Sequence, residues 1–536
     1  MLAFFLSILV IISWSLINPY KTGESPLTNN SKKLENKIEL SKSDSSGILS
    51  EFLQPKEEDE RQETESIQLI ENNKLIIELT NIGGKPKKIT LKEHNHTFPL
   101  THLLGLSLFN NQVFNLIHFN KNEVVYIMET DHLQIVNSFT ITQDENLMLA
   151  NIEIISKDLM SNLETFNLDG FLIDIPAKNS QDNNQEPYSD YMLYEYVFKT
   201  PEKIIRKDKA YQFSKKNNLN QTSNLKWFGF RDRYFCVIIK PEFKISSFLT
   251  EFINNKRLKF SLLAENKELM SNQKINFNFL IYIGPQEKEL LKKYDPEFND
   301  IIAYTNFGII NFFAVLIINL LNVINKIFSN LGISIIILAS IIYIFTYPLN
   351  FKSMMSMRNY SQSMQILQPQ IAKINEKYKD NVVKKNQELS ELMKKHKIAP
   401  PLGGCLPLLL QMPIFIGLYQ VLWRNISLKG ARFLWINDLS EPDRLFVLHS
   451  NIILLGNEFN LLPIFVVILM IIQQKLSSKN MVITDSVQAS QQKMMTFLLP
   501  VIFGLMFYRM ASGLNLYFNV YYLLSILTQW KLSRKS

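Results

Sequence analysis

The run Leu402-Gly-Gly-Cys-Leu-Pro-Leu-Leu-Leu-Gln-Met-Pro-Ile-Phe-Ile-Gly-Leu-Tyr-Gln-Val-Leu-Trp423 carries no charged residue. It is long enough to cross the hydrocarbon core of a bilayer, which takes about 20 residues of helix. It also contains two prolines, two glutamines and a tyrosine, and polar side chains within a span are typical of contacts between membrane helices. We therefore expect the chain after residue 330 to form helices packed around this span, and the chain before it to lie outside the membrane.

The composition indicates a membrane protein and gives no sign of catalysis. Of the 536 residues, 46% are hydrophobic, and they concentrate at 1–20 and after residue 308. The net charge of +8 is modest, and residues 351–402 alone hold ten Lys or Arg against four Asp or Glu, which indicates membrane orientation rather than DNA binding. The sequence has no phosphate-binding glycine loop, nucleophile elbow or zinc-peptidase motif, so we expect neither an enzyme nor a bound cofactor or metal.

The cysteines and histidines do not suggest a site. Cys236 lies in a region of β pattern and Cys405 lies at the start of a span, so we expect no disulfide between them. His94-Asn-His96 has the spacing of half a metal site, but such a lone pair is more often part of a solvated loop, and we favour the loop.

The first 285 residues divide into three parts. Residues 1–20 are apolar and lack a small-residue cleavage site, which favours an uncleaved transmembrane signal anchor over a cleaved signal peptide. Residues 21–65 are rich in Ser, Asn, Lys and Glu without apolar periodicity, which predicts a flexible tether. Residues 66–285 alternate apolar and polar positions between turn signals, as in Ile275-Asn-Phe-Asn-Phe279, and this predicts an antiparallel β-sandwich. A sandwich can bind a sugar or a peptide, but nothing here marks such a site, so we favour a structural domain.

Residues 286–330 are expected to lead back to the membrane, first as a polar helix over 286–302 and then as the nearly apolar Ile309–Phe328. The polar residues of this second segment fall on one narrow stripe of a helix: Asn311, Asn319, Asn322 and Lys326. If this helix crossed the bilayer, the lysine-rich residues 351–402 would lie outside, whereas short basic loops stay in the cytoplasm. We therefore interpret the segment as an amphipathic helix in the outer interface.

Residues 331–530 are predicted to hold five transmembrane helices, which with the N-terminal anchor makes six. The expected spans are 331–348, 402–423, 460–474, 494–508 and 514–530, followed by a short basic tail at 531–536. Basic residues flanking the spans place both termini in the cytoplasm and the β-domain on the outer side.

Residues 351–402 are predicted to form a cytoplasmic helical hairpin. Apolar residues recur at spacings of three and four over 364–378 and again over 389–396, with a break at Asp380-Asn381. This pattern predicts two short helices packed antiparallel, the first of which starts or kinks at Pro369.

Four motifs resemble those of the YidC/Oxa/Alb membrane protein insertases, in the family's order and at its spacing over about 330–531. They are Leu367-Gln-Pro-Gln-Ile371, Pro401 to Phe415, Trp435-Ile-Asn-Asp-Leu-Ser440 and Ser512-Gly-Leu-Asn-Leu-Tyr517. Upstream, Leu79 to Gly84 and Trp227 to Pro241 resemble the large periplasmic domain of the bacterial YidC branch, a β-supersandwich.

The resemblance implies a membrane protein insertase and chaperone in the bacterial inner membrane, with the large domain in the periplasm. Such proteins accept hydrophobic segments of nascent membrane proteins, alone or with the Sec translocon and the ribosome, and release them into the lipid bilayer without a cofactor. Their helices enclose a hydrophilic groove open to the cytoplasm, which receives the polar tail of the substrate. The outer domain is then expected to be largely dispensable, so that deleting about 70–260 while keeping residues 286–328 leaves most of the activity.

One position departs from the family pattern. The family's groove arginine corresponds to Tyr343, ahead of Tyr347-Pro348-Leu349, which puts in doubt a mechanism based on pairing with an acidic substrate. Without this charge, the polarity of the groove must come from neutral side chains. The candidates are Ser340, Tyr343, Gln411, Gln420, Asn515, Tyr517 and Asn519. Hydrogen bonding between helices is the plain alternative for each, and the motif position favours the groove for Gln411 and Tyr343.

Two further sets of residues are candidates. The hairpin methionines offer the flexible surface that promiscuous binding sites use, and they are Met354, Met355, Met357 and Met364. Arg424 and Arg509 lie near the outer ends of spans. For Arg509 we favour snorkelling to lipid headgroups over a role as the charge of the groove.

Two other functions remain open. One is a polytopic transporter that uses the polar span residues as a solute site, and the other is a scaffold that only assembles other membrane proteins. Transporters of this kind show internal repeats with matched broken helices, and the sequence shows no such symmetry.

Overall fold

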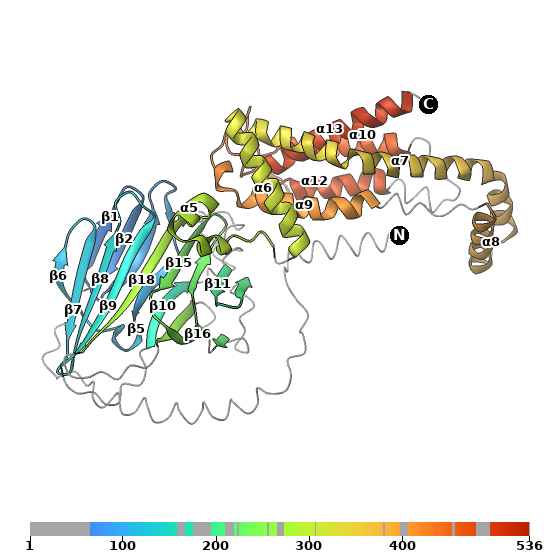
Figure 1. The fold of residues 1–536 in the computed structure, drawn as a ribbon. Coiled ribbons are helices and arrows are strands. Elements are labelled where there is room, and N and C mark those ends of the chain that lie inside the picture. Colours follow the sequence, from blue (N-terminus) through green and yellow to red (C-terminus); the bar gives the residue numbers. More distant parts are fainter. Residues whose placement is uncertain are drawn as a thin grey trace.

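The computed structural model describes residues 65–157, 167–174, 195–208, 219–221, 224–253, 257–264, 273–305, 307–378, 381–396, 406–452, 456–478 and 494–534. The expected signal anchor at 1–20 lies outside the described residues, as do the expected tether up to residue 64 and Cys405. In the described part, a β-domain is joined to a helical bundle, with α5 and α6 at the junction (Figure 1).

The described residues of the β-domain form three sheets of antiparallel strands. The largest has nine strands in the order β12-β11-β14-β15-β18-β9-β8-β7-β6. Its strands are β6 Asn115–Phe119, β7 Glu123–Glu129, β8 Leu133–Ile141, β9 Leu147–Ser156, β11 Glu195–Lys199, β12 Ile204–Asp208, β14 Trp227–Arg231, β15 Phe235–Pro241 and β18 Lys274–Pro285.

The two smaller sheets have the orders β13-β16-β17-β10-β5 and β1-β2-β3-β4. The strands of the first are β5 Leu100–Leu106, β10 Asn167–Asp174, β13 Leu219–Gln221, β16 Ile245–Ile253 and β17 Arg257–Ala264. The strands of the second are β1 Ile67–Glu71, β2 Leu75–Thr80, β3 Lys85–Leu91 and β4 His96–Thr97, and the 3-10 turn η1 Ser107–Phe109 follows β5.

One hydrophobic core joins all three sheets, which makes the domain a sandwich as predicted. It contains Leu75 of β2, Phe260 of β17 and Ile281 of β18, all fully buried. The alternation read from the sequence is the cause, because successive side chains of a strand point to opposite faces of a sheet and β18 buries every second residue along most of its length. Between β2 and β3, Gly83 and Gly84 have φ of 74° and 52°, a conformation that glycine adopts without steric cost.

The expectation of a solvated loop at the histidines is wrong for His96. This side chain is buried, its ring stacks on Phe235 at 4.6 Å, and its Nε2 atom lies 2.8 Å from an Asp232 carboxylate oxygen. An aromatic face and an acidic partner at the same place explain why the residue leaves the solvent. Within the described ranges, no group of three His, Cys, Asp or Glu residues is placed to hold a metal ion. Cys236 is a free, buried thiol.

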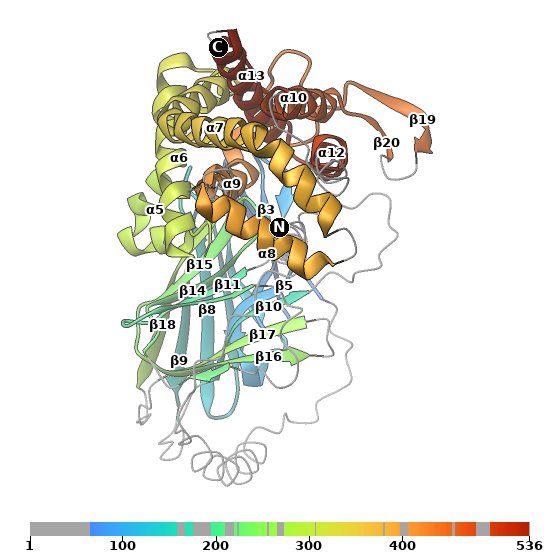
Figure 2. The same ribbon diagram turned by 90° about the vertical axis from the view of Figure 1, so that its right-hand side faces the viewer.

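After the β-domain the chain is largely helical. The elements are α5 Lys288–Tyr294, η3 Pro296–Ile301, α6 Gly308–Phe328, α7 Leu331–Lys377, α8 Val382–Lys395, α9 Leu406–Arg424, η5 Ile426–Leu428, β19 Phe446–Ile452, β20 Gly456–Phe459, α10 Leu461–Ser478, a π-helical turn Met494–Leu498, α12 Leu499–Phe507 and α13 Ser512–Arg534. By length and composition, α6 and α7 are apolar enough to cross a membrane, and Leu461–Ser477 and Thr496–Phe507 are shorter apolar helices. The hairpin β19–β20, which was not predicted, projects from the side of the bundle (Figure 2).

Helix α6 differs in direction from the other long helices. It runs across the bundle, whereas α7, α9, α10, α12 and α13 run roughly alongside one another (Figure 1). Its packed face is Ala314, Ile317, Leu321 and Ile324. Of the predicted polar stripe, Asn319, Asn322 and Lys326 are exposed. The helix therefore buries one face in protein and presents a separate polar stripe.

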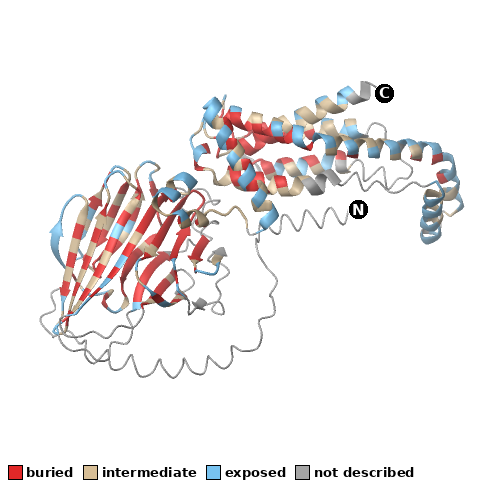
Figure 3. Ribbon diagram, in the orientation of Figure 1, coloured by how far each residue is buried: buried red, intermediate tan, exposed pale blue. Residues whose placement is uncertain are grey.

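The expected span 331–348 and the first arm of the hairpin form one continuous helix. Helix α7 has 47 residues and contains both Pro348 and Pro369, so the prediction that Pro369 starts a separate short helix is wrong. A helical proline loses one backbone hydrogen bond and crowds the preceding turn, but both prolines are exposed here and disturb no packed neighbour. Figure 3 shows that burial is concentrated in the part of the bundle near α6, whereas the far end of α7 and α8 are largely exposed.

The predicted packing between the two arms of the hairpin is observed. Met364, Leu367 and Ile371 of α7 are buried against Leu389, Leu392 and Met393 of α8. The break between the arms is also where the sequence placed it, because the Asn381 side chain accepts a hydrogen bond from the Lys384 amide and so caps the start of α8.

Candidate functional site: a polar cluster between three helices

Tyr343 makes a contact between two helices. Its side chain is buried, and its hydroxyl donates to Oγ1 of Thr528 at 2.7 Å. Thr528 in turn donates to the Leu524 carbonyl of its own helix at 2.9 Å. Tyr343 therefore ties α7 to α13 through neutral groups.

Tyr521 extends this contact to a third helix. Its ring packs edge-on against the Tyr343 ring at 5.4 Å. Its hydroxyl accepts a hydrogen bond from the Asn350 amide at 3.1 Å and donates to the Gln411 side-chain oxygen at 3.5 Å. The fully buried Tyr517 stacks on Tyr521 with ring centroids 6.1 Å apart.

We call this set the polar cluster. Its members come from α7, α9 and α13, and all of them are uncharged: Tyr343, Asn350, Gln411, Tyr517, Tyr521 and Thr528. Of the seven predicted groove residues, the structure brings together Tyr343, Gln411 and Tyr517.

The predicted asparagines of α13 lie on the opposite face of that helix. Asn515 donates to the Phe507 carbonyl at 3.1 Å, and Asn519 donates to the Leu462 carbonyl at 3.1 Å. Both therefore face α10 and α12 instead of α7. Their buried side-chain oxygens have no hydrogen-bond partner among the described residues. A buried acceptor without a partner costs about 1–3 kcal/mol, so these two oxygens lower the stability of the packing between α13 and its neighbours.

Ser340 and Gln420 also lie apart from the polar cluster. The Ser340 hydroxyl donates to the Ile336 carbonyl of its own helix at 2.9 Å. Gln420 is nine residues from Gln411, which is 2.5 turns of helix and puts the two on opposite faces of α9. Its buried side-chain oxygen likewise has no partner within the described ranges.

The sequence analysis missed three members of the polar cluster, Asn350, Tyr521 and Thr528. A signal for them was present. Asn350 follows Tyr343 by seven residues, and Tyr521 and Thr528 follow Tyr517 by four and eleven, so each shares a helix face with a residue already proposed.

The hairpin methionines differ in their surroundings. Met364 is buried in the seam with α8, so its role there is packing and it offers no free surface. Met354 and Met355 are half-buried, and the side chain of Met357 lies outside the described residues.

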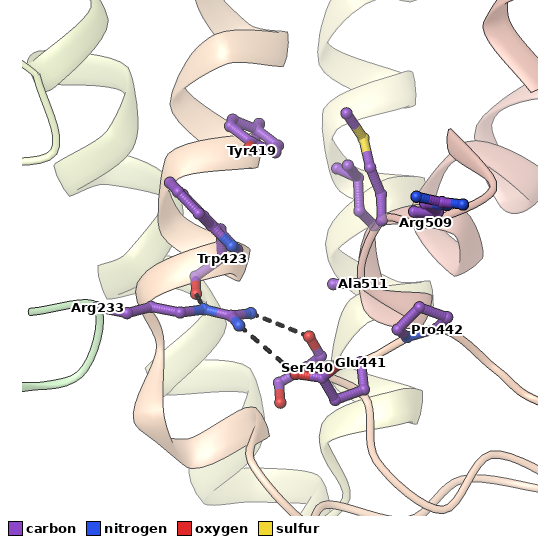
Figure 4. A pocket seen from close by; sticks show the side chains of 10 residues that line it. Arg233, Tyr419, Trp423, Ser440, Glu441, Pro442, Arg509 and Ala511 are labelled. Carbon is purple, nitrogen blue, oxygen red and sulfur yellow. Dashed lines mark hydrogen bonds and ion pairs between the residues drawn. The ribbon is translucent and has the colours of Figure 1, made fainter. Parts of the chain in front are cut away.

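A cavity of about 130 Å³ lies at the end of the bundle nearest the β-domain, which we call the β-domain end. It is lined by residues of α9, of the loop before β19, of the turn between α12 and α13 and of the first turn of α13, with Arg233 reaching it from the β-domain (Figure 4). Arg509 lies at its rim and is exposed, which fits the headgroup interpretation. Arg424 donates to the Ala303 carbonyl at 3.0 Å and so is bound to the linker.

Comparisons with known proteins follow the same division of the chain. The family model described as "YidC periplasmic domain" matches residues 118–320, and the model described as "60Kd inner membrane protein" matches residues 323–536. A β-domain of the first kind joined to a helical core of the second defines an inner membrane protein with a periplasmic domain. The chain belongs to the YidC family, as the sequence motifs predicted.

Individual relatives agree with this assignment. A protein from Citrifermentans bemidjiense, named membrane protein insertase YidC, is 34% identical over 321 residues, which cover 60% of this chain and 54% of the relative. A protein of the same name from Chlamydia trachomatis serovar D is 36% identical over 268 residues, which cover 47% and 33%. This chain thus spans about half, or less, of the length of these curated relatives. A crystal structure of an active YidC insertase is 17% identical over 87% of this chain and 93% of that chain, with a TM-score of 0.37.

Proposed function

We propose that this chain is a membrane protein insertase and chaperone, which inserts and folds nascent inner-membrane proteins through a hydrophilic surface open to the cytoplasm. The observation that carries the proposal is the polar cluster. It gathers neutral hydrogen-bonding groups between α7, α9 and α13, and the outer surfaces of these helices are apolar.

Helix α7 by itself combines the two properties that an insertase needs, a polar face and an exposed apolar face. Tyr343 faces the polar cluster, whereas the neighbouring Ile344 and Phe345 are 69% and 78% exposed. A substrate's polar tail can exchange hydrogen bonds with the neutral groups, while its apolar segment moves along the greasy face. Neutral groups suit this task because a charge held within a membrane is costly, and they do not restrict the substrate to acidic tails.

The proposed topology has six transmembrane spans. Five form the insertase core, from the first part of α7, α9, α10, α12 with the turn before it, and α13, and the sixth is the N-terminal anchor. Helix α6 lies in the outer interface. Its polar stripe and its course across the bundle support this placement (Figure 1). Both termini and the hairpin of α7 and α8 are then cytoplasmic, and the β-domain is periplasmic.

The proposed partners are nascent membrane proteins, the lipid bilayer, the Sec translocon and the ribosome. The hairpin is the element that first receives the substrate, and its lysines suit anionic lipid or ribosomal RNA. No cofactor enters the mechanism, because partition of the apolar segment into lipid is itself favourable.

The proposal is tested with the purified full-length chain in liposomes that contain no other protein. A small single-span substrate, similar to a phage coat protein, is added, and its protection from protease is measured with and without the chain. We expect protected substrate only in liposomes that contain the chain. Equal protection in empty liposomes would sink the proposal, and solute flux through the chain would favour the transporter. Depleting the chain in cells distinguishes an insertase from a scaffold. Loss of a scaffold would leave the small substrate inserted, whereas loss of an insertase would not.

A further inference from the structure

Arg233 belongs to the β-domain but makes its contacts in the helical bundle. It lies in the tight turn between β14 and β15, where the Asp232 carboxylate accepts hydrogen bonds from the backbone amides of Tyr234 and Phe235 at 2.8 and 2.6 Å. The other Asp232 oxygen lies 2.8 Å from His96. The turn is thus held on both sides, and it directs Arg233 away from its own domain.

The Arg233 guanidinium connects α9 to the loop that follows it. Its Nε donates to the Trp423 carbonyl at 2.6 Å, in the last turn of α9, and its Nη2 donates to the Ser440 carbonyl at 3.0 Å (Figure 4). Its Nη1 lies 3.6 Å from a Glu441 carboxylate oxygen, and the side chain is only 4% exposed. The last carbonyls of a helix lack partners within the helix and favour a cation, so the contact is favourable for α9.

The same loop holds the start of α13. The amide of Ser512 donates to the Glu441 carbonyl at 2.7 Å, and the amide of Gly513 donates to the Leu439 carbonyl at 2.9 Å. The Ser512 hydroxyl donates to the Asp438 carbonyl at 3.0 Å. One side chain of the β-domain therefore ties the end of α9 to the start of α13, the two helices that carry Gln411 and Tyr517.

We propose that Arg233 is a positioning residue for insertion: it clasps α9 and α13 at the β-domain end and so keeps the polar cluster closed to the outside. This inference rests on the insertase function proposed above. Arginine suits the role because its planar fork reaches two acceptors at once in a fixed geometry, whereas lysine is a single point charge. Burial of the charge is tolerated because the guanidinium donates to two backbone carbonyls and lies beside the Glu441 carboxylate.

The clasp is tested by cysteine labelling from the β-domain side. Ala511 is buried beside the cavity, so Ala511→Cys is introduced in the full chain after Cys236 and Cys405 are replaced by alanine. A membrane-impermeant maleimide is then added to right-side-out vesicles. We expect Arg233→Gln to raise the labelling rate about tenfold, since hydrogen bonds to a charged group are lost, and to slow insertion of the substrate into liposomes.

The matched control is Arg206→Gln. Arg206 is also an arginine of the β-domain, but it donates to the backbone carbonyls of Asp300 and Ile301 in the linker, so its loss should leave labelling at the rate of the parent. Arg233→Lys keeps the charge but not the fork. It should label faster than the parent but more slowly than Arg233→Gln, and it decides the question if the glutamine variant does not fold.

Labelling at the parental rate in a folded Arg233 variant would overturn the clasp. Equal acceleration by Arg206→Gln would also overturn it, because the effect would then be a general loosening of the β-domain. The labelling rate does not depend on insertion. If the parent chain inserts nothing, the proposed function fails while the labelling still reports on closure.

Discussion

At the scale of single residues, Tyr343 makes two kinds of contact, one through its hydroxyl and one through its ring. Its hydroxyl is bonded to Thr528 and its ring is buried, so the two parts of the side chain can be tested separately. Tyr343→Phe removes one hydrogen bond between membrane helices, worth on average about 0.6 kcal/mol, and should slow insertion about threefold or less. Tyr343→Ala also leaves a cavity between α7 and α13 and should abolish most insertion in a complementation assay.

The control for Tyr343 is Arg509→Gln. Because Arg509 is exposed at the cavity rim, this variant should insert substrate normally. If Arg509→Gln fails while Tyr343→Ala works, the charge of the groove has moved to Arg509 and the neutral mechanism is wrong.

Asp169 is the centre of a buried ionic group in the β-domain. Burial alone raises its pKa, but the neighbouring His102 side chain, the hydrogen bond from Ser107 and the charge of Lys259 outweigh burial and hold the pKa well below 3.8. The Ser107 hydroxyl lies 2.6 Å and the Lys259 ammonium 2.9 Å from the same carboxylate oxygen. Burial also lowers the pKa of Lys85 to about 8, although Asp169 partly offsets it.

Replacing Asp169 with Asn should destabilise the β-domain by about 3 kcal/mol at neutral pH, because two lysines lose their counter-charge in a buried site. A carboxylate whose pKa falls on folding stabilises the fold above its unfolded pKa of 3.8 and loses this contribution as the pH falls further. The difference in melting temperature between the parent and Asp169→Asn, followed by the β-sheet circular dichroism, should therefore shrink below about pH 3.8. Asp131→Asn, at an exposed turn, should show no difference, and a gap for Asp169→Asn that is independent of pH would contradict the argument.

At the scale of elements, the helical hairpin depends on one small seam. Met364 is buried there, whereas Ile366, two residues along the same helix, is 78% exposed. Met364→Ala should loosen the packing of α8 by about 2 kcal/mol and raise the rate of proteolytic cleavage within α8 several-fold, while Ile366→Ala should not. Equal cleavage of the two variants would show that the seam does not hold the hairpin.

Elements whose pattern reflects local geometry were predictable, and elements fixed by distant contacts were not. The alternation of Ile275, Phe277 and Phe279 predicted the strand β18, because alternation follows directly from burial of one face. The continuity of α7 through Pro369 was missed, because a proline lowers helix propensity locally and only the neighbouring turns decide whether the helix continues. Helical spacing placed Tyr517 and Asn519 in one span, but only the partner helices decide which of them meets Tyr343.

At the scale of the whole molecule, the β-domain and the helical bundle share contacts well beyond a tether. Ile426, just after α9, is part of the core of the β-domain, and the Lys429 ammonium lies 5.4 Å from the centre of the Tyr234 ring. Arg424 binds the linker at Ala303 and Arg233 binds the end of α9. A sequence read one segment at a time cannot foresee such contacts, because each joins residues more than 100 positions apart.

These contacts also decide where the outer domain can be removed. A deletion of about 70–260 would leave β18 without its two partners, β15 and β9, and a long unpaired strand invites aggregation. It would also uncover Leu291, Phe298 and Ile301, which are fully buried in a cluster with Trp227. A deletion of 66–301 avoids both faults, because it removes the strand and its covering helices together.

The chain without 66–301 should keep most of its insertion activity. We expect its loss of activity to match that of Arg233→Gln, since the proposed clasp joins the β-domain to both α9 and α13. Deletion of 370–397, which removes most of the hairpin, should impair insertion more than either change, because we propose that the hairpin receives the substrate. Insertion into liposomes by the three variants, each compared with the parent at equal amounts of folded protein, tests this order. A 66–301 deletion that inserts normally would show that Arg233 is not needed once its domain is gone. One that inserts nothing, with the helical bundle intact, would give the β-domain a role beyond the clasp.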